Sequence, residues 1–198
     1  MRKCLPAAGC KDIHEGLDLS ALICSVPEYR KELVKRFPLV ATGGTFDEIH
    51  VGHLALLSKA FQAGEKVIIG VSTDQFAKKR GKKLNHDFEQ RVSNLRETIA
   101  KEFGSVNYEI ARLDTDFGPA VTSGAVGALV ASTDTQAKGM VLNEMRARLG
   151  LEPVVVIAVE LVKAEDGSPI SSTRIRSGEI DRTGTLVKRE DSGVNKPR

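Results

Sequence analysis

The chain has 198 residues, of which 41% are hydrophobic and 18 are glycines. This length and apolar content fit one α/β domain with an appendage and leave too little chain for two full-sized domains. Aromatic residues make up 5% with no tryptophan, and 29 basic against 26 acidic side chains give a net charge of +3. This composition predicts neither a base-stacking surface nor an overall field that attracts nucleic acid or membranes.

Cysteine content and apolar patterning favour a cytoplasmic protein. The 3 cysteines are an odd number that cannot form a complete disulfide framework. No apolar run approaches the roughly 18 residues of a membrane-spanning helix. The first residues also lack the apolar stretch of a signal peptide. We therefore expect a cytoplasmic protein with no membrane partner.

Residues 1–36 show no alternation of strand and helix patterns and are expected to form an N-terminal extension. A short amphipathic helix is predicted over Glu28–Lys35. A conceivable set of zinc ligands in this extension comprises Cys4, Cys10, His14 and Cys24. Because these residues lack the short paired gaps of zinc motifs, unliganded thiols are the favoured interpretation.

From Phe37 onward, short β-branched runs alternate with helical patterns. The predicted strands are Leu39–Ala41, Val67–Val71, Val106–Ile110, Ala128–Ala131 and Val154–Val159. The predicted helices are Val51–Ala63, Phe88–Phe103, Pro119–Val126 and Thr135–Leu149. This alternation predicts a Rossmann-like, doubly wound parallel sheet of about five strands in an α/β domain over residues 37–180. The polar composition from residue 181 predicts a C-terminal tail over 181–198.

The loop after the first predicted strand carries two adjacent glycines, Gly43 and Gly44, followed by a helix start with His50 and His53. In a doubly wound sheet, ligands bind at the carboxyl ends of the strands, and a helix N-terminus favours an anion such as phosphate. The loop has neither the Walker A spacing nor the dinucleotide-binding glycine pattern. Two histidines three apart are also compatible with surface or capping side chains, or with part of a metal site.

The second predicted strand is followed by a basic run, Lys78–Lys83, in which only Gly81 is uncharged. A solvated surface is the usual interpretation of such a run, and nucleic-acid attraction is the next. Its place at a strand end also allows it to neutralise two anionic substrates. Arg91 either adds a further cation there or pairs with Asp87, four residues earlier on the same helix.

A third candidate element is Ile-Ser-Ser-Thr-Arg-Ile-Arg at residues 170–176, which follows a turn sequence. Ser171 is a candidate N-cap, and Ser172, Thr173 and Arg174 have the hydroxyl and guanidinium groups that hold phosphate oxygens. The alternative is an ordinary capping sequence before a short surface helix.

Gly-Thr-Phe-Asp at 44–47 followed by His-Val-Gly-His at 50–53 resembles the signature of the nucleotidyltransferase superfamily. Together with Ile-Ser-Ser-Thr-Arg-Ile-Arg, these motifs look like the phosphopantetheine adenylyltransferase family of the archaeal and eukaryotic type, over about Phe37 to Ile180. The resemblance implies the HIGH-type nucleotidyltransferase fold and the transfer of the adenylyl group of ATP to 4'-phosphopantetheine. The Arg-Gly-Leu-Arg segment of the bacterial branch has no counterpart, so a monomer is expected instead of the bacterial hexamer.

The resemblance also implies roles for individual residues. His53 is expected to contact the transition state, His50 to assist on the ATP phosphates, and Lys82 to bridge the attacking phosphate and the α-phosphate. Thr45 is expected to contact both substrates. The residues expected to bind ATP are Gly44, Thr45, Phe46, His50, His53, Arg91, Ser171, Ser172, Thr173 and Arg174. Mg²⁺ is expected to accompany ATP, bound mostly by phosphate oxygens and water, without a dedicated protein site.

Two alternatives remain open from the sequence. Another adenylyl- or cytidylyltransferase, acting on nicotinamide mononucleotide, flavin mononucleotide or a phospho-alcohol, would keep the same helix starts and differ in the acceptor pocket. A non-enzymatic nucleic-acid-binding protein would use the basic runs instead.

Overall fold

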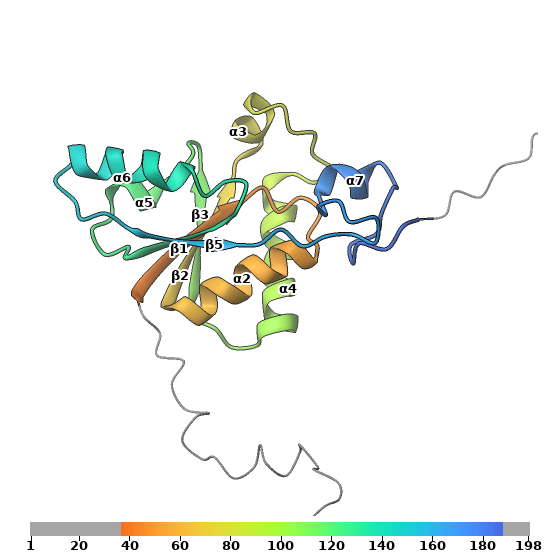
Figure 1. Cartoon of the computed structure of the whole chain (residues 1–198), viewed down its shortest axis with the longest axis horizontal. Helices are drawn as coiled ribbons and strands as arrows, with labels where there is room; N and C mark the ends of the chain where they lie inside the picture. Colours follow the sequence, from red (N-terminus) through yellow and green to blue (C-terminus); the bar gives the residue numbers. More distant parts are fainter. Residues whose placement is uncertain (1–36, 188–198) are drawn as a thin grey trace, which may run out of the picture. The chain divides into compact units, whose positions relative to one another are not determined.

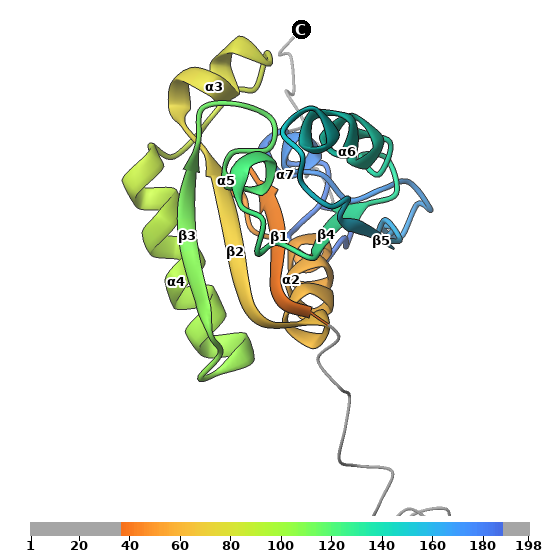
Figure 2. The same cartoon turned by 90° about the vertical axis from the view of Figure 1, so that its left-hand side faces the viewer.

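The computed structural model describes residues 37–187, in which five strands form one parallel sheet in the order β3-β2-β1-β4-β5. The strands are β1 Phe37–Gly44, β2 Gly64–Ser72, β3 Tyr108–Leu113, β4 Ala128–Ser132 and β5 Val155–Val159. Figure 2 shows this order across the sheet. Chain order reverses at β1, which pairs with both β2 and β4, so the crevice expected for a ligand lies at the carboxyl end of β1. The predicted α/β fold is confirmed.

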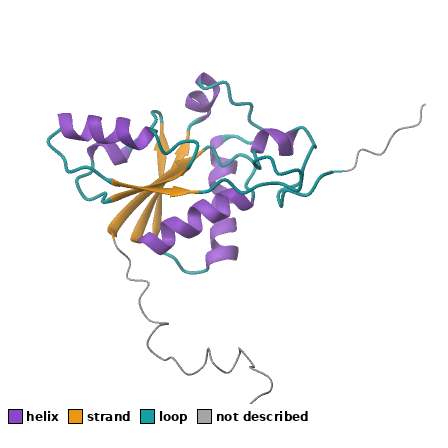
Figure 3. Cartoon of the chain, in the orientation of Figure 1, coloured by secondary structure: helices purple, strands orange, loops and turns teal. Residues whose placement is uncertain are grey.

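Helices lie on both faces of the sheet (Figures 1 and 3), with α2 and α4 on one side and α5 and α6 on the other. Their bounds are α2 Val51–Ala63, α3 Asp74–Lys79, α4 Phe88–Phe103, α5 Pro119–Thr122, α6 Lys138–Arg148 and α7 Ser172–Arg176. None of the helices in the described range has the length and apolar content needed to cross a membrane.

The bounds of α2 and α4 agree with the sequence prediction, and local capping explains those of α4. Asp87 accepts from the Gln90 amide at 2.9 Å while Gln90 Oε1 accepts from the Asp87 amide, which forms a capping box. Gly104 ends the helix with a φ of 65°, a left-handed value that glycine adopts without strain.

Several other predicted bounds were wrong. Helix α5 ends at Thr122, because the chain turns at Ser123 and buries Val126 on the way into β4. Helix α6 starts at Lys138, since turns occupy the residues before it. Strand β3 begins at Tyr108 and continues to Leu113, because its residues pair with β2 along their whole length. Helix α3 was not predicted.

Two apolar clusters fill the layers around the sheet. Residues of β1 and β2, such as Val40 and Ile69, pack with Leu57 and Leu95 on the face covered by α2 and α4. The smaller cluster beneath α5 and α6 contains Leu142, which is fully buried. Burial of these side chains supplies the main driving force for the layered arrangement.

A third cluster holds the segment after β5 against the N-terminal end of α2. Ala164, Ile170 and Ile180 form its buried centre, with Val51 and Ile175 packed against it. Residues 181–187 continue this unit, since Ile180 pairs with Leu186 in an antiparallel bridge and the Leu186 amide donates to Glu165 Oε2 at 2.9 Å. The domain therefore extends beyond the predicted boundary at residue 180. The predictions for 1–36, including the helix and the thiols, and those for 188–198 lie outside the described residues.

Candidate functional site

A cavity of about 340 Å³ opens at the carboxyl edge of the sheet. Its walls come from the β1–α2 loop, the segment after α3, the start of α7 and the loops that follow β4 and β5. It is lined by the last residue of every strand, namely Gly44, Ser72, Leu113, Ser132 and Val159. The edge predicted from the strand and helix alternation is therefore the edge where the cavity forms.

The β1–α2 loop approaches the cavity through its two glycines. A Cβ atom on Gly43 would lie 3.0 Å from the Gly70 carbonyl oxygen, and one on Gly44 would lie 3.2 Å from the Phe46 ring. Phe46 itself is fully buried with a φ of 52°, a left-handed conformation that is strained for an aromatic residue. The buried Phe46 side chain thus fixes the conformation of the loop. It lies beneath the cavity floor and does not line the cavity wall.

His50 is the N-cap of α2, and its Nδ1 atom accepts a hydrogen bond from the Gly52 amide at 3.2 Å. This contact places the imidazole proton of the neutral form on Nε2. Burial lowers the pKa of His50 to about 4. The ring is therefore a neutral hydrogen-bond donor near neutral pH.

His53 stacks between two rings, with its centroid 4.0 Å from that of His50 and 5.0 Å from that of Phe46. The residue lines the cavity and stays partly accessible, while its Nδ1 atom is buried without a hydrogen-bond partner among the described residues. Burial, His50 and the positive charge of Lys82 lower the pKa of His53 to about 3, and the nearby Glu48 carbonyl opposes this shift only in part. Both imidazoles are thus neutral, and positive charge at the site comes from other residues.

The amides of the first turn of α2 are already bonded. The Val51 amide donates to the Arg182 carbonyl at 3.2 Å, the Gly52 amide to His50 Nδ1, and the His53 amide to the His50 carbonyl at 2.8 Å. These three amides are therefore not free to bind the anion that a helix N-terminus was expected to favour. The imidazole rings and side chains around the cavity remain as the donors.

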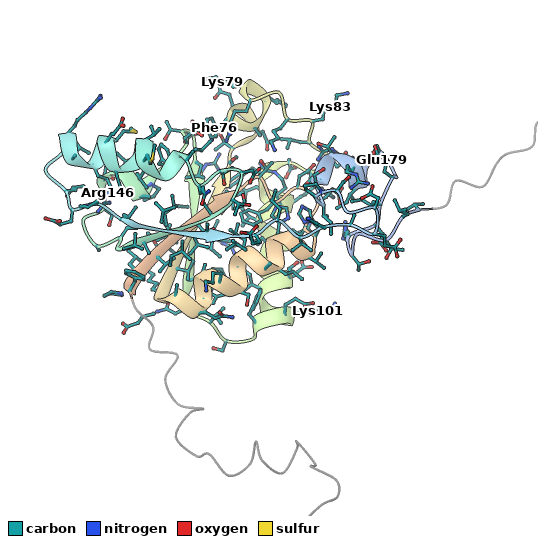
Figure 4. The ribbon with its side chains drawn as sticks, viewed as in Figure 1. Phe76, Lys79, Lys83, Lys101, Arg146 and Glu179 are labelled. Carbon is teal, nitrogen blue, oxygen red and sulfur yellow. The ribbon has the colours of Figure 1, made fainter. Side chains whose placement is uncertain are left out.

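Part of the basic run faces the cavity. Arg80, Lys82 and Lys83 line it, and Lys82 is close enough to His53 for its charge to lower the histidine pKa. Figure 4 shows Lys79 at the outer end of α3 and Phe76 at its base. Lys78 and Lys79 thus belong to α3, whose N-cap is Thr73. Arg80, Lys82 and Lys83 follow this helix and border the cavity.

Ser171 caps α7 as predicted, and its Oγ accepts from the Arg174 amide at 3.3 Å. Ser172 donates to the Glu48 carbonyl at 3.3 Å, which joins α7 to the β1–α2 loop. Thr173 Oγ1 accepts from Arg176 at 3.2 Å and keeps its own proton for a ligand. All these residues of α7 and its cap except Arg174 line the cavity.

Asp47 lies at the centre of these elements and is 1% exposed. Its carboxylate accepts from the amides of Asn85 and His86 at about 3.0 Å and from Arg176 Nη1 at 2.9 Å. Burial alone would raise the pKa of this carboxyl, but the hydrogen bonds from Asn85 and His86 and the charge of Arg176 hold it below its usual value. Asp47 is therefore an anion that bridges the β1–α2 loop, the loop after α3, and α7.

Comparison with known proteins gives the family. The cytidylyltransferase-like family matches residues 41–178. The chain is 40% identical over 164 residues to phosphopantetheine adenylyltransferase of Methanothermobacter thermautotrophicus, which covers 83% of this chain and 98% of that protein. It is 35% identical over 161 residues to the enzyme of the same name from Pyrococcus horikoshii, at 78% and 98% coverage. The chain belongs to the phosphopantetheine adenylyltransferase family.

Solved structures agree with the fold of this family. A protein from Archaeoglobus fulgidus, described as of unknown function, aligns with a TM-score of 0.55 at 28% identity, covering 61% of this chain and 97% of that chain. A tyrosyl-tRNA synthetase from the same organism aligns with a TM-score of 0.51 at 16% identity, covering 71% of this chain and 60% of that chain. The second likeness concerns the fold alone.

Two arginines do not lie where the family resemblance led us to expect them. Arg174 turns away from the cavity and pairs with Asp166 and Glu179, whose hydrogen bonds raise the pKa of its guanidinium. Arg91 is fully buried, donates to the Thr45 carbonyl, and pairs with Asp74 at 2.8 Å and not with Asp87. Arg91 thus supports the loop from behind, while Arg174 fixes the turn around α7.

Sequence reasoning missed Arg176 and Asp47. Arg176 lines the cavity because it lies three residues after Thr173 on the same side of α7. That spacing was a readable signal, since residues three and four apart on a helix share a face. Asp47 belongs to the Gly-Thr-Phe-Asp motif, but its role could not be read locally because its partners lie 38, 39 and 129 residues away.

The site offers no free carboxylate cluster for a resident magnesium ion among the described residues. Asp47, Glu48 and His86 have ligand atoms within 4.8 Å of one another. However, Arg176 holds Asp47 and Arg182 holds Glu48, each at 2.9 Å. These carboxylates already have cationic partners, so they do not fit a dedicated metal site.

Proposed function

We propose that this chain transfers the adenylyl group of ATP to 4'-phosphopantetheine, giving dephospho-coenzyme A and pyrophosphate. An oxygen of the acceptor phosphate bonds to the α-phosphorus, while the bond from that phosphorus to the β-bridging oxygen breaks and its electron pair leaves with pyrophosphate. The reaction needs no protein nucleophile, so the protein acts by positioning two anions and stabilising the charge of the transition state.

The neutral imidazole pair beside Lys82 is the observation that supports this proposal most directly. A neutral imidazole N–H contacts a phosphate oxygen through a hydrogen bond without transferring its proton. We assign the contact with the transition state to His53 and an assisting contact on the ATP phosphates to His50. The Lys82 ammonium, whose charge already acts on His53, bridges the attacking phosphate and the α-phosphate.

The other residues of the cavity complete the ATP site in this proposal. Gly44 and Thr45 line the floor beside the reacting phosphates, and the Ser171, Ser172 and Thr173 side chains bind the departing pyrophosphate. Arg176 replaces Arg174 as the α7 cation that faces it. Arg91 and Phe46 act from beneath the loop and do not touch ATP.

We expect Mg²⁺ to enter with ATP and to be bound by phosphate oxygens and water. When bound, it neutralises charge on the phosphates. We also propose that the enzyme acts as a monomer in the cytoplasm. The mass of the purified chain in solution, measured by light scattering with and without ATP, tests the monomer.

Pyrophosphate release tests the function. Purified protein is incubated with ATP and either 4'-phosphopantetheine, nicotinamide mononucleotide, flavin mononucleotide or buffer. Release with 4'-phosphopantetheine alone supports the proposal. Release with another acceptor keeps adenylyl transfer and replaces the acceptor, whereas no release with any acceptor contradicts the proposal.

The nucleic-acid alternative is disfavoured by the placement of the basic run. Arg80 pairs with Asp116 at 3.4 Å, and Lys82 and Lys83 line the cavity. Part of the run is therefore paired with Asp116 or borders a concave site, which favours a small anionic ligand over a nucleic-acid strand.

A further inference from the structure

The carboxylate of Asp47 joins two elements that border the cavity, the loop after α3 and helix α7. Oδ1 accepts from the His86 amide at 3.0 Å and from His86 Nδ1 at 3.2 Å, and both donors belong to the loop that follows Lys82 and Lys83. Oδ2 accepts from Arg176 Nη1 of α7 at 2.9 Å. The Asn85 amide lies between them, within hydrogen-bond distance of both oxygens.

Arg176 links the Asp47 carboxylate to the wall of the cavity. Its second terminal nitrogen, Nη2, donates to Thr173 Oγ1 at 3.2 Å, so one planar guanidinium joins the buried carboxylate to a hydroxyl that lines the cavity. The Arg176 side chain is 14% exposed. A guanidinium held at both terminal nitrogens loses most of its rotational freedom before a ligand arrives.

We propose that Asp47 is a positioning residue that orients Arg176 and Thr173 for the pyrophosphate of ATP through the contact between Oδ2 and Arg176. The loop that carries Lys82 is held by Asn85, which contacts both oxygens, and by His86, which contacts Oδ1. This inference rests on the proposed function. The contact with α7 involves Oδ2 alone, whereas Oδ1 carries most of the contacts with the loop, so a substitution that alters the Oδ2 side affects the two elements unequally.

Asp47→Asn separates the two roles. The amide oxygen of asparagine at the Oδ1 position keeps an acceptor for the Asn85 and His86 amides, while its amino group at the Oδ2 position faces Arg176 as a second donor. In this orientation the contact with α7 is lost. The loop keeps its bonds to the Oδ1 position, and the Asn85 amide loses only its second acceptor. Loss of one charge-assisted hydrogen bond predicts a roughly 10- to 100-fold weaker affinity for pyrophosphate.

The experiment uses the full chain and measures two quantities, the binding of inorganic pyrophosphate by calorimetry and the KM for the acceptor in steady-state turnover. For D47N we expect the pyrophosphate Kd to rise by that factor, with the acceptor KM within about twofold of the native value. Glu48→Gln is the matched control, since it neutralises an adjacent buried carboxylate that contacts Arg182 and the Asn85 side chain of the loop but not Arg176. We expect E48Q to change the pyrophosphate Kd by less than about twofold.

Arg176→Lys provides an independent measurement if D47N does not fold. Lysine keeps the charge but cannot donate to Asp47 and Thr173 from a planar fork. Weaker pyrophosphate binding by R176K shows that binding needs the planar fork that Asp47 and Thr173 hold, and native affinity overturns the proposal. In a double-mutant cycle, R176K should add little to D47N, because both remove the same contact.

The proposal is overturned if D47N leaves pyrophosphate binding intact, or if it weakens binding of acceptor and pyrophosphate equally. It is also overturned if E48Q has the same effect as D47N, since general loss of buried charge would then explain both. These outcomes are distinct from failure of the proposed function, which appears as an absence of turnover with 4'-phosphopantetheine in the native protein, whereas pyrophosphate binding is measured without acceptor.

Discussion

His50 and His53 stack with their ring centroids 4.0 Å apart at the start of α2, and burial keeps both rings neutral. Two imidazolium ions at this distance would repel each other strongly in a partly buried site. The arrangement therefore stabilises the neutral forms together. In the proposed reaction, this pair provides two uncharged donors beside the reacting phosphates.

His53→Ala should lower kcat by about 100- to 1,000-fold, the usual effect of removing one preorganised donor from a charge-stabilising site. The Glu48 carbonyl beside the His53 ring also accepts from the Ser172 hydroxyl, so truncation of His53 leaves that acceptor with a donor. Steady-state turnover at saturating substrates and a thermal melt check this. A melt that collapses in parallel with kcat would indicate a structural role. His53→Asn keeps a donor and is expected to retain more activity than the alanine variant.

The low pKa values of the histidines predict that stability is lost on acidification. In the unfolded chain a histidine has its ordinary pKa of 6.5, whereas in the fold the pKa is about 4 for His50 and about 3 for His53. The unfolded state therefore binds more protons below pH 6.5. The contribution is fully present above that pH and is lost as the pH falls toward the folded values, by on the order of 1 kcal/mol per histidine per pH unit.

Urea unfolding at pH 7.5, 6.5 and 5.5 measures this loss. His50→Asn should flatten the decline between the two lower pH values, because one titrating group is removed. An unchanged slope in H50N would show that other groups cause the acid sensitivity.

Lys82→Ala should lower kcat by about 100-fold, because the charge that bridges the two phosphates is removed. The same substitution should raise the pKa of His53, since the Lys82 charge helps to lower it. The titration of the His53 ring by NMR measures this second effect without any substrate. Lys79→Ala, at the outer end of α3, is the control and should leave both quantities unchanged.

Arg146→Met should destabilise the fold by about 2–4 kcal/mol. The Arg146 guanidinium is 1% exposed and donates to the carbonyls of Ala120 at 2.6 Å, Ser123 at 2.9 Å, Val126 at 3.3 Å and, through Nε, Glu152 at 2.8 Å. Figure 4 places it in α6, away from the cavity. Methionine fills much of the space but leaves these carbonyls without donors. A shift in the denaturation midpoint with both KM values unchanged is the expected result.

The sequence predicts the sheet and the first helix start well, because both depend on local patterns. Alternating β-branched runs define the strands, and the glycines before His50 define the loop. Helix α3 escaped prediction because Lys78 and Lys79 belong to a charged run that resembles a solvated loop, and only Thr73 signals its start.

The side-chain directions on α7 were harder to predict. Arg174 and Arg176 are two residues apart on one short helix, so they project to different sides. Which side faces the cavity depends on Asp166 and Glu179, which hold Arg174, and on Asp47, which holds Arg176 from a distant part of the chain. Such long-range pairs leave no periodic signal.

The bond from the Val51 amide to the Arg182 carbonyl also sets a lower limit on how far the chain can be shortened. A protein that stops at residue 178, where the family match ends, would lose this carbonyl, the Arg182 partner of Glu48 and the bridge from Ile180 to Leu186. The Val51 amide would then lose its acceptor and would bond to water at the helix start that carries both histidines. A C-terminal truncation should therefore remove only residues after 187, and a cleavable fusion should be joined after that residue. The N-terminal end of α2, which carries both histidines, then stays undisturbed.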